Sequence, residues 1–143
     1  MIISSQRNPI LNSSINPRLN SSINPRLNSS INPILNSSIN PRLNSSINPR
    51  LNSSINPRLN SSFEGYYLFD LDNNALFFVI QVDTVLIQIF NFDFENIMFG
   101  VLTDESGYAL FNPNNEYIGH LQSDKSEGFN QFDTENNWVG HIK

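Results

Sequence analysis

The chain has 143 residues, the length of one ordinary domain or two small ones, and it contains no cysteine. The lack of cysteine excludes disulfides, thiol chemistry and the common structural zinc sites. The net charge of −5 combines two unlike halves, because residues 1–62 carry six arginines and no acid while residues 63–143 carry all 13 acids and both lysines. Every aromatic residue also lies in the second half, so we divide the chain into residues 1–62 and residues 63–143.

Two features bear on membranes and export. The first residues, MIISSQRNPI, lack a charged segment followed by an apolar run, so no secretory signal is visible and a cytoplasmic location is the default expectation. The longest apolar run, Ala75–Ile80, is too short to span a bilayer.

Residues 1–62 repeat an octad with the consensus Ile-Asn-Pro-Arg-Leu-Asn-Ser-Ser. Its prolines recur once per octad from Pro9 to Pro57, which indicates a repeat architecture. A proline in every octad excludes a continuous helix, because it removes a backbone donor and forces the preceding residue out of the helical region.

Two structures fit this array. One is a β-solenoid over residues 4–62, with strands at the aliphatic residues, corners at Asn-Pro and Asn-Ser-Ser, and both isoleucine and leucine in a buried ladder. The other is a disordered tether, because two aliphatic residues in each octad offer little apolar area against the entropy of ordering. The ends of the array favour the solenoid: its first unit is irregular, as a cap would be, and Phe63 leads into the second half without a linker.

The arginines occupy one position of the octad and would form a row. Ile10 and Ile34 take this position in two of the units. The row is either a solvated face or a surface for something acidic, such as the second half of a neighbouring molecule or a nucleic acid. Nucleic acid is disfavoured, since the array has no aromatic residue for base stacking. The candidate binding arginines are Arg18, Arg26, Arg42, Arg50 and Arg58.

Residues 63–143 contain four similar windows that predict β-hairpins. Each opens with Phe and Asp or Asn, has Asn at the fourth position after the Phe, and ends in alternating apolar residues, with glycine in three of the windows. The early Asp or Asn would start the turn, and the later Asn would adopt the left-handed conformation. The glycine suggests a bulge or a close backbone approach. The predicted windows are residues 69–79, 92–102, 111–121 and 132–142, with the left-handed residues Asn73, Asn96, Asn115 and Asn136.

Four hairpins predict about eight short strands, arranged as a meander, a small barrel or a flat stack. The windows resemble bacterial hairpin repeats with the pattern Tyr-Asp-x-x-Gly-x-x-Ile-Gly-x-Ile, with Asn here in place of the turn glycine. The resemblance implies a repeat module of surface or accessory proteins and no particular activity.

Few residues suggest chemistry. His120 and His141 hold equivalent positions, but a metal pair would lack a clear third ligand, so we expect two exposed strand residues. No serine is marked as an activated nucleophile. We therefore predict a protein that is not an enzyme, with no catalytic, metal-binding or cofactor-binding residues.

The aromatic residues suggest a different site. Tyr66, Tyr67, Tyr108, Tyr117 and Trp138 would either line a sugar-binding face or pack between hairpins, and we keep Tyr117 and Trp138 as candidate binding residues. The run Val85–Phe90 is apolar on both faces, which predicts a central buried strand or a self-association surface.

These observations together predict an all-β repeat protein with a solenoid-like array at residues 1–62 and a four-hairpin antiparallel domain at residues 63–143. The expected function is structural: the array would be a spacer or assembly unit, and the hairpins a cap or docking module. Self-association or another protein partner is expected. The alternative is a binding module that recognises a glycan or protein through the hairpins, or a polyanion through the arginine row.

Overall fold

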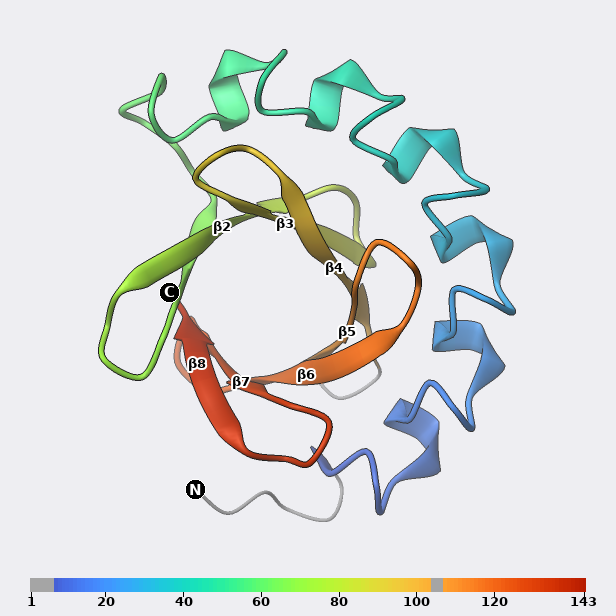
Figure 1. Cartoon of the computed structure of the whole chain (residues 1–143). Helices are drawn as coiled ribbons and strands as arrows, with labels where there is room; N and C mark the ends of the chain where they lie inside the picture. Colours follow the sequence, from blue (N-terminus) through green and yellow to red (C-terminus); the bar gives the residue numbers. More distant parts are fainter. Residues whose placement is uncertain (1–6, 104–106) are drawn as a thin grey trace.

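The structure is a computed structural model that describes residues 7–103 and 107–143. Residues 66–142 form a closed β-barrel, and residues 8–62 run around its outside as a single curved layer, which we call the belt (Figure 1). In the described part of the chain, no helix has the length and apolar character needed to cross a membrane.

The barrel is built from eight strands that pair in chain order. Every neighbouring pair is antiparallel, and pairing of Leu68 with Ile142 closes the barrel between the first and last strands. The prediction of four antiparallel hairpins is confirmed, and the barrel is the arrangement formed. The strands are β1 (Tyr66–Phe69), β2 (Ala75–Gln81), β3 (Leu86–Asn91), β4 (Asn96–Leu102), β5 (Gly107–Phe111), β6 (Tyr117–Ser123), β7 (Phe129–Phe132) and β8 (Trp138–Ile142).

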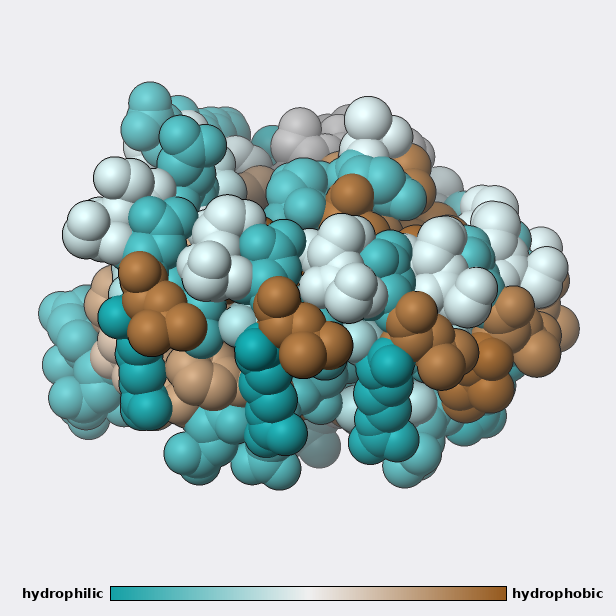
Figure 2. Space-filling view, turned by 90° about the horizontal axis from the view of Figure 1, so that it is seen from above, coloured by the Kyte–Doolittle hydropathy of each residue, from teal (hydrophilic) through white to brown (hydrophobic). Residues whose placement is uncertain are grey.

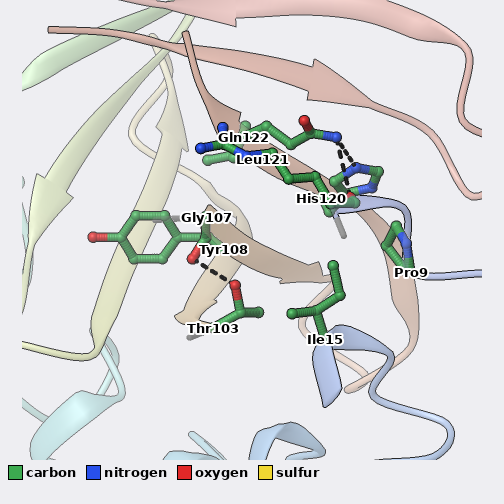
Figure 3. Close-up of a pocket in the computed structure, with 9 residues that line it drawn as sticks. Pro9, Ile15, Thr103, Gly107, Tyr108, His120, Leu121 and Gln122 are labelled. Atoms are coloured by element: carbon green, nitrogen blue, oxygen red, sulfur yellow. Dashed lines mark hydrogen bonds between the residues drawn. The ribbon is translucent and has the colours of Figure 1, made fainter. Parts of the chain in front are cut away.

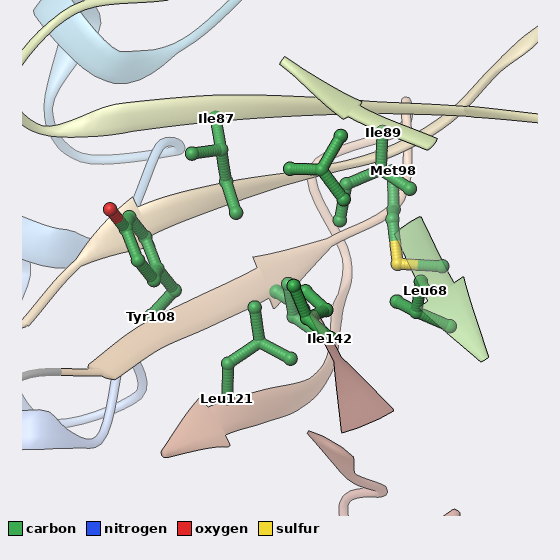
Figure 4. Packing of buried hydrophobic residues seen from close by; sticks show 9 residues of the cluster. Leu68, Ile87, Ile89, Met98, Tyr108, Leu121 and Ile142 are labelled. Carbon is green, nitrogen blue, oxygen red and sulfur yellow. The ribbon is translucent and has the colours of Figure 1, made fainter. Parts of the chain in front are cut away.

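Side chains fill the barrel interior, as expected for a barrel of this size. Aliphatic residues from strands on opposite sides meet at the centre, among them Leu68, Ile89 and Leu121, each at most 1% exposed (Figure 4). The buried cluster consists of Leu68, Val79, Ile87, Ile89, Met98, Tyr108, Leu110, Leu121 and Ile142.

The four hairpin turns lie at one end of the barrel and recur at even spacing along the chain. A phenylalanine opens each turn beside a β-bulge: Phe69, Phe90, Phe111 and Phe132. The next residue caps the turn with its side-chain oxygen. Asp70 Oδ1, for example, accepts hydrogen bonds from the backbone amides of Asp72 and Asn74, both at 2.9 Å.

The left-handed residues confirm the predicted turns in three hairpins and correct the second. Asn73, Asn115 and Asn136 have φ of 63–64°, as expected. In the second hairpin Phe94 takes this conformation, with φ of 65°, and Asn96 lies in β4 instead. The predicted window started too late, at Phe92, because the segment Phe90-Asn91-Phe92-Asp93 offers two Phe–Asx pairs and the first is the one that opens the turn.

The predicted close approach at the shared glycine is confirmed in the last two hairpins. A Cβ atom on Gly119 would lie 2.1 Å from the carbonyl oxygen of Phe132, and one on Gly140 would lie 2.5 Å from that of Phe69. Gly119 also has a φ of +143°, which side chains rarely tolerate.

Stacked rings join each hairpin to the next on the outer face of the barrel. Each opening phenylalanine faces a ring on the second strand of the preceding hairpin, with centroids 5.1–5.4 Å apart and interplanar angles of 17–24°. The offset stacking favoured by aromatic pairs thus recurs at all four seams. The pairs are Phe78–Phe90, Phe99–Phe111, His120–Phe132 and His141–Phe69.

The belt consists of tight turns, and no β-strand lies in its described residues. In each octad the four residues from Asn-Pro to Leu form one turn, and Asn-Ser-Ser-Ile forms a short 3₁₀ segment in the octads that end at Ile15 to Ile55. The 3₁₀ segments are η2 (Ser13–Ile15), η3 (Ser21–Ile23), η4 (Ser29–Ile31), η5 (Ser37–Ile39), η6 (Ser45–Ile47) and η7 (Ser53–Ile55).

The two asparagines of an octad hold its turns together. Asn20 Oδ1 accepts from the backbone amide of Ser22 at 3.1 Å, while Asn20 Nδ2 donates back to the carbonyl of Ser14 at 2.7 Å. Asn24 Nδ2 donates in the same way to the carbonyl of Pro17, at 3.0 Å. The Asn-Ser-Ser asparagines from Asn20 to Asn60 all cap the turn ahead and bond to the unit behind, and the Asn-Pro asparagines Asn24, Asn40 and Asn56 do the same, which connects successive octads without strand pairing.

The predicted β-solenoid is wrong, for two physical reasons. The asparagines satisfy the backbone within and between adjacent turns, so the octads have no need of a ladder. In addition, only one of the two aliphatic rows is buried: Ile15, Ile23, Ile31, Ile39 and Ile47 are 3–9% exposed, whereas the leucines are 67–71% exposed. One buried row suits a layer laid on another surface and does not suit a ladder enclosed within coils.

The buried isoleucines cover the outer face of the barrel. Ile23, Ile31 and Ile39 share an apolar cluster with residues of β3, β4 and β5, and Ile47 packs with residues of β2 and β3. A buried polar contact marks the centre, where Gln88 Nε2 donates to the carbonyl of Ile39 at 2.7 Å. The predicted central buried strand at Val85–Phe90 is confirmed for Leu86–Phe90, because β3 lies between the barrel core and the belt, whereas Val85 precedes β3 and is 41% exposed.

Side-chain contacts set the register of belt against barrel at three octads per hairpin. Asn136 Nδ2 donates to Asn8 Oδ1 at 2.7 Å, and Asn115 Nδ2 donates to Asn32 Oδ1 at 2.8 Å. Asn8 and Asn32 lie three octads apart, and the two turn asparagines belong to adjacent hairpins. Three octads further on, the second hairpin presents Phe94, and there the guanidinium of Arg58 lies 5.4 Å from the ring centroid of Phe94.

A matched pair of alanine substitutions tests whether the belt packs in this way. We expect Ile39→Ala to lower the free energy of unfolding by about 2–4 kcal/mol, because it leaves a cavity against the barrel. We expect Leu43→Ala, at a leucine that is 67% exposed, to change it by less than about 0.5 kcal/mol. Urea denaturation followed by tryptophan fluorescence measures both, and equal effects would contradict the packing.

Candidate functional site

Two equivalent grooves lie between the belt and the hairpin-turn end of the barrel. The large groove holds about 580 Å³ and the small groove about 260 Å³. Each belt residue of the small groove has a counterpart three octads later in the large groove, and each barrel residue has a counterpart at the same position of the preceding hairpin. The pairs are Pro17/Pro41, Arg18/Arg42, Asn24/Asn48, Arg26/Arg50, Phe111/Phe90, Asn115/Phe94, Glu116/Glu95 and Tyr117/Asn96.

Two arginines from successive octads form the belt wall of each groove. Their backbones are fixed by the octad turns, since the amides of Arg42 and Arg50 donate to Asn40 Oδ1 and Asn48 Oδ1, both at 2.9 Å. Their side chains are exposed, and Arg50 Nη2 also donates to the carbonyl of Asp93 at 3.0 Å. The guanidinium groups thus stand on a rigid backbone and reach toward the turns.

A glutamate held by an asparagine stands on the barrel wall of each groove. Asn91 Nδ2 donates to Glu95 Oε1 at 3.0 Å in the large groove, and Asn112 Nδ2 donates to Glu116 Oε1 at 2.9 Å in the small groove. Both bonds close the same kind of hairpin turn, so the carboxylate position follows from the turn geometry. Each groove therefore has cations on one wall and a carboxylate on the other.

The two grooves have different side chains at two of the paired positions, Asn115/Phe94 and Tyr117/Asn96, and the large groove also extends over further residues such as Pro113. Tyr117 is half-buried in the small groove, and the smaller Asn96 takes its place in the large one, with Nδ2 turned to Gln88 Oε1 at 2.8 Å. Burial raises the pKa of Tyr117 to about 12, partly offset by the charge of Arg18. The phenol is thus protonated at neutral pH and able to donate a hydrogen bond.

The side chains that line the grooves suit a polar ligand. Guanidinium groups bind anions, while amide carbonyl oxygens and carboxylates accept hydrogen bonds from hydroxyl groups. No group of three or more His, Asp or Glu side chains suited to a metal ion occurs within residues 7–103 and 107–143.

The structure brings five of the seven predicted binding residues to the grooves: Arg18, Arg26 and Tyr117 to the small one, and Arg42 and Arg50 to the large one. Arg58 lies beside the large groove, over Phe94. Trp138 is elsewhere, on β8, where its indole nitrogen donates to the carbonyl of Gly140 at 2.9 Å.

The single aromatic sugar-binding face does not form. Tyr108 lies inside the barrel, and Tyr67 packs between Phe63 and Phe92 on its outer face. Tyr66 is largely exposed on β1.

Sequence reasoning missed the barrel residues of the grooves, above all Glu95, Glu116 and Asn96. The signal was present in the even spacing of Phe69, Phe90, Phe111 and Phe132, which places Glu95 and Glu116 at one position of the hairpin repeat.

The expectation that both histidines are exposed strand residues is wrong for His120, which is 5% exposed, and His141 is half-buried against Phe69. Pro9 of the first octad lies beside the ring of His120 and Ile15 lines the same pocket, while Gln122 Nε2 approaches the Nε2 of His120 at 3.0 Å (Figure 3). The Nδ1 of His120 has no hydrogen-bond partner among the described residues. Burial lowers the pKa of His120 to about 4, against a smaller opposing effect of Asp133.

The buried histidine predicts a specific loss of stability in acid. The ordinary pKa of a histidine is 6.5, and that of the folded His120 is about 4. Between these two pH values the unfolded chain binds a proton that the folded chain excludes, so the free energy of unfolding decreases by up to about 3 kcal/mol as the pH is lowered. His120→Phe copies the ring pairs of two other seams, and we expect it to reduce this loss. Thermal melts from pH 7 to pH 4 measure the effect, with His141→Phe as control. An unchanged pH dependence in His120→Phe would contradict the burial.

None of the protein-family models, curated proteins or solved structures compared with the chain matches it.

Proposed function

We propose that this chain is a non-enzymatic binding protein that holds an anionic, hydroxyl-bearing ligand in the grooves between belt and barrel. The observation that carries the proposal is the pair of grooves with the same eight positions, each walled by two exposed arginines on fixed backbone. An array made only to cover the barrel needs its isoleucines and asparagines, and it has no need of arginines aligned with barrel glutamates.

The mixed charge of the grooves selects the kind of ligand. A carboxylate or a single sulfate would pair with the guanidinium groups, while hydroxyls of the same ligand would donate to Glu95 or Glu116. Prolines and phenylalanines also line the large groove, but a purely apolar molecule would leave the charges of Arg42, Arg50 and Glu95 without partners.

The position of the belt favours binding over a spacer role. Residues 8–62 lie against the barrel, so the array adds little length to the molecule. The belt instead supplies one wall of each groove, which gives it a part in recognition.

Titration with small anions tests the proposal. We expect trigalacturonate to shift the backbone amide resonances of Arg42, Arg50 and Glu95, and we expect the double variant Arg42→Gln/Arg50→Gln to lose these shifts while keeping those of the small groove. The double variant Lys125→Gln/Lys143→Gln is the control, because it removes the same charge away from the grooves.

The panel also includes a sulfated disaccharide and tripolyphosphate. Absence of arginine-dependent shifts with every member of the panel would contradict the proposed function.

Self-association is a second candidate function, favoured by the exposed leucine row. Figure 2 views the belt from outside and shows hydrophobic side chains in a line, beside hydrophilic ones that extend toward one edge of the molecule. The leucines at 67–71% exposure are joined by Ile34, at 61%. Folding leaves this row uncovered, and a second copy of the chain is the occupant we propose for its centre around Leu27, Ile34 and Leu35.

Sedimentation velocity over a concentration series tests the second candidate. We expect the wild-type chain to form dimers as concentration rises, and the triple variant Leu27→Gln/Ile34→Arg/Leu35→Gln to stay monomeric. Leu71→Gln, at an exposed apolar residue in the turn between β1 and β2, is the control. A monomer at every concentration would contradict this function and leave the groove proposal unaffected.

A further inference from the structure

We infer that the two grooves act together on one ligand, a linear polyuronate with one carboxylate on each sugar. This inference rests on the proposed function, which it deepens by naming the ligand class and the mode of binding. Its basis is the match between two unrelated repeats, the octad and the hairpin, which places two copies of one site on the same edge of the molecule.

The two grooves share a wall. Pro113 and Asn114 line the large groove, while Asn115 and Glu116 of the same turn line the small one. On the belt side, Pro33 and Ile34 extend the large groove toward Arg26. A chain leaving one groove thus meets the next across a single turn, without crossing the barrel.

The contact between the grooves is fixed. Asn32 Oδ1 accepts from Asn115 Nδ2 at 2.8 Å and from the backbone amide of Ile34 at 2.9 Å, and both asparagines are buried. This bond joins belt to barrel midway between the sites, so the distance between the two arginine pairs is set before any ligand binds. Two rigidly spaced copies of a site favour a ligand with a repeating unit, because the second contact is then intramolecular.

The charge pattern favours a polymer of low charge density. Each groove has two arginines facing a carboxylate, and no arginine lies between the pairs because Ile34 takes that octad position. A polyphosphate or heavily sulfated chain would bring anions against Glu95 and Glu116. A polyuronate brings hydroxyls there, which donate to carboxylates.

Calorimetry with oligogalacturonates of increasing length tests the inference. We expect short oligomers to bind with two molecules per chain. Above a threshold length we expect one molecule per chain, with an affinity increased by about 10²-fold or more. Either double variant, Arg18→Gln/Arg26→Gln or Arg42→Gln/Arg50→Gln, should abolish the increase while one short oligomer still binds, and Lys125→Gln/Lys143→Gln should retain it.

Three results would overturn the inference. Long oligomers that bind as two independent short ones would show that the grooves do not share a ligand. An affinity increase that survives loss of either arginine pair would place the second contact elsewhere. Polyphosphate or heparin of matched length that binds as tightly, with the same arginine dependence, would contradict selection of low charge density. Failure of the short oligomers and of the small-anion panel would instead count against the proposed function itself.

Discussion

The outer face of the barrel is the constraint on which the rest of the structure depends. Strands β2 to β5 are apolar outside as well as inside, so a free barrel would expose buried residues such as Phe78, Phe90, Phe99 and Phe111 to water. The belt removes this surface with one isoleucine per octad. Its backbone needs no partner strand, since the asparagines satisfy it locally, and the belt can therefore follow a curved surface.

The match between the two repeats explains how nearly identical octads find one position. An octad array could slip by one whole unit at little cost in isoleucine packing, because each unit presents the same side chains. The units that differ from the consensus oppose this slip: Ile34 replaces arginine in one octad, and Phe63 replaces isoleucine at the end of the array and packs against Phe78. The same register aligns the arginine pairs with Glu95 and Glu116, so the proposed recognition depends on the same alignment as the packing.

Local chemistry made part of this fold predictable. Asx residues capped the hairpin turns, three of the four left-handed asparagines were correctly placed, and proline excluded a helical array. The error at Asn96 came from two overlapping Phe–Asx pairs. The solenoid failed because sequence gives isoleucine and leucine the same hydrophobicity, and only the barrel surface distinguishes the buried row from the exposed one. The arginines and Tyr117 were identified as candidates by type, whereas the grooves were not predictable, since they form between segments that lie far apart in the sequence.

The most direct test of this account is the set of nuclear Overhauser contacts between the side-chain amide of Gln88 and the belt. Gln88 is fully buried and donates to the carbonyl of Ile39, so we expect contacts to Ile39 and Asn40, with the isoleucine assigned through Ile39→Val. Contacts to Ile31 or Ile47 instead would show a belt in another register and would separate the arginine pairs from their glutamates. Absence of any contact to residues 8–62 would show that the belt does not cover the barrel, and the central claim would be wrong.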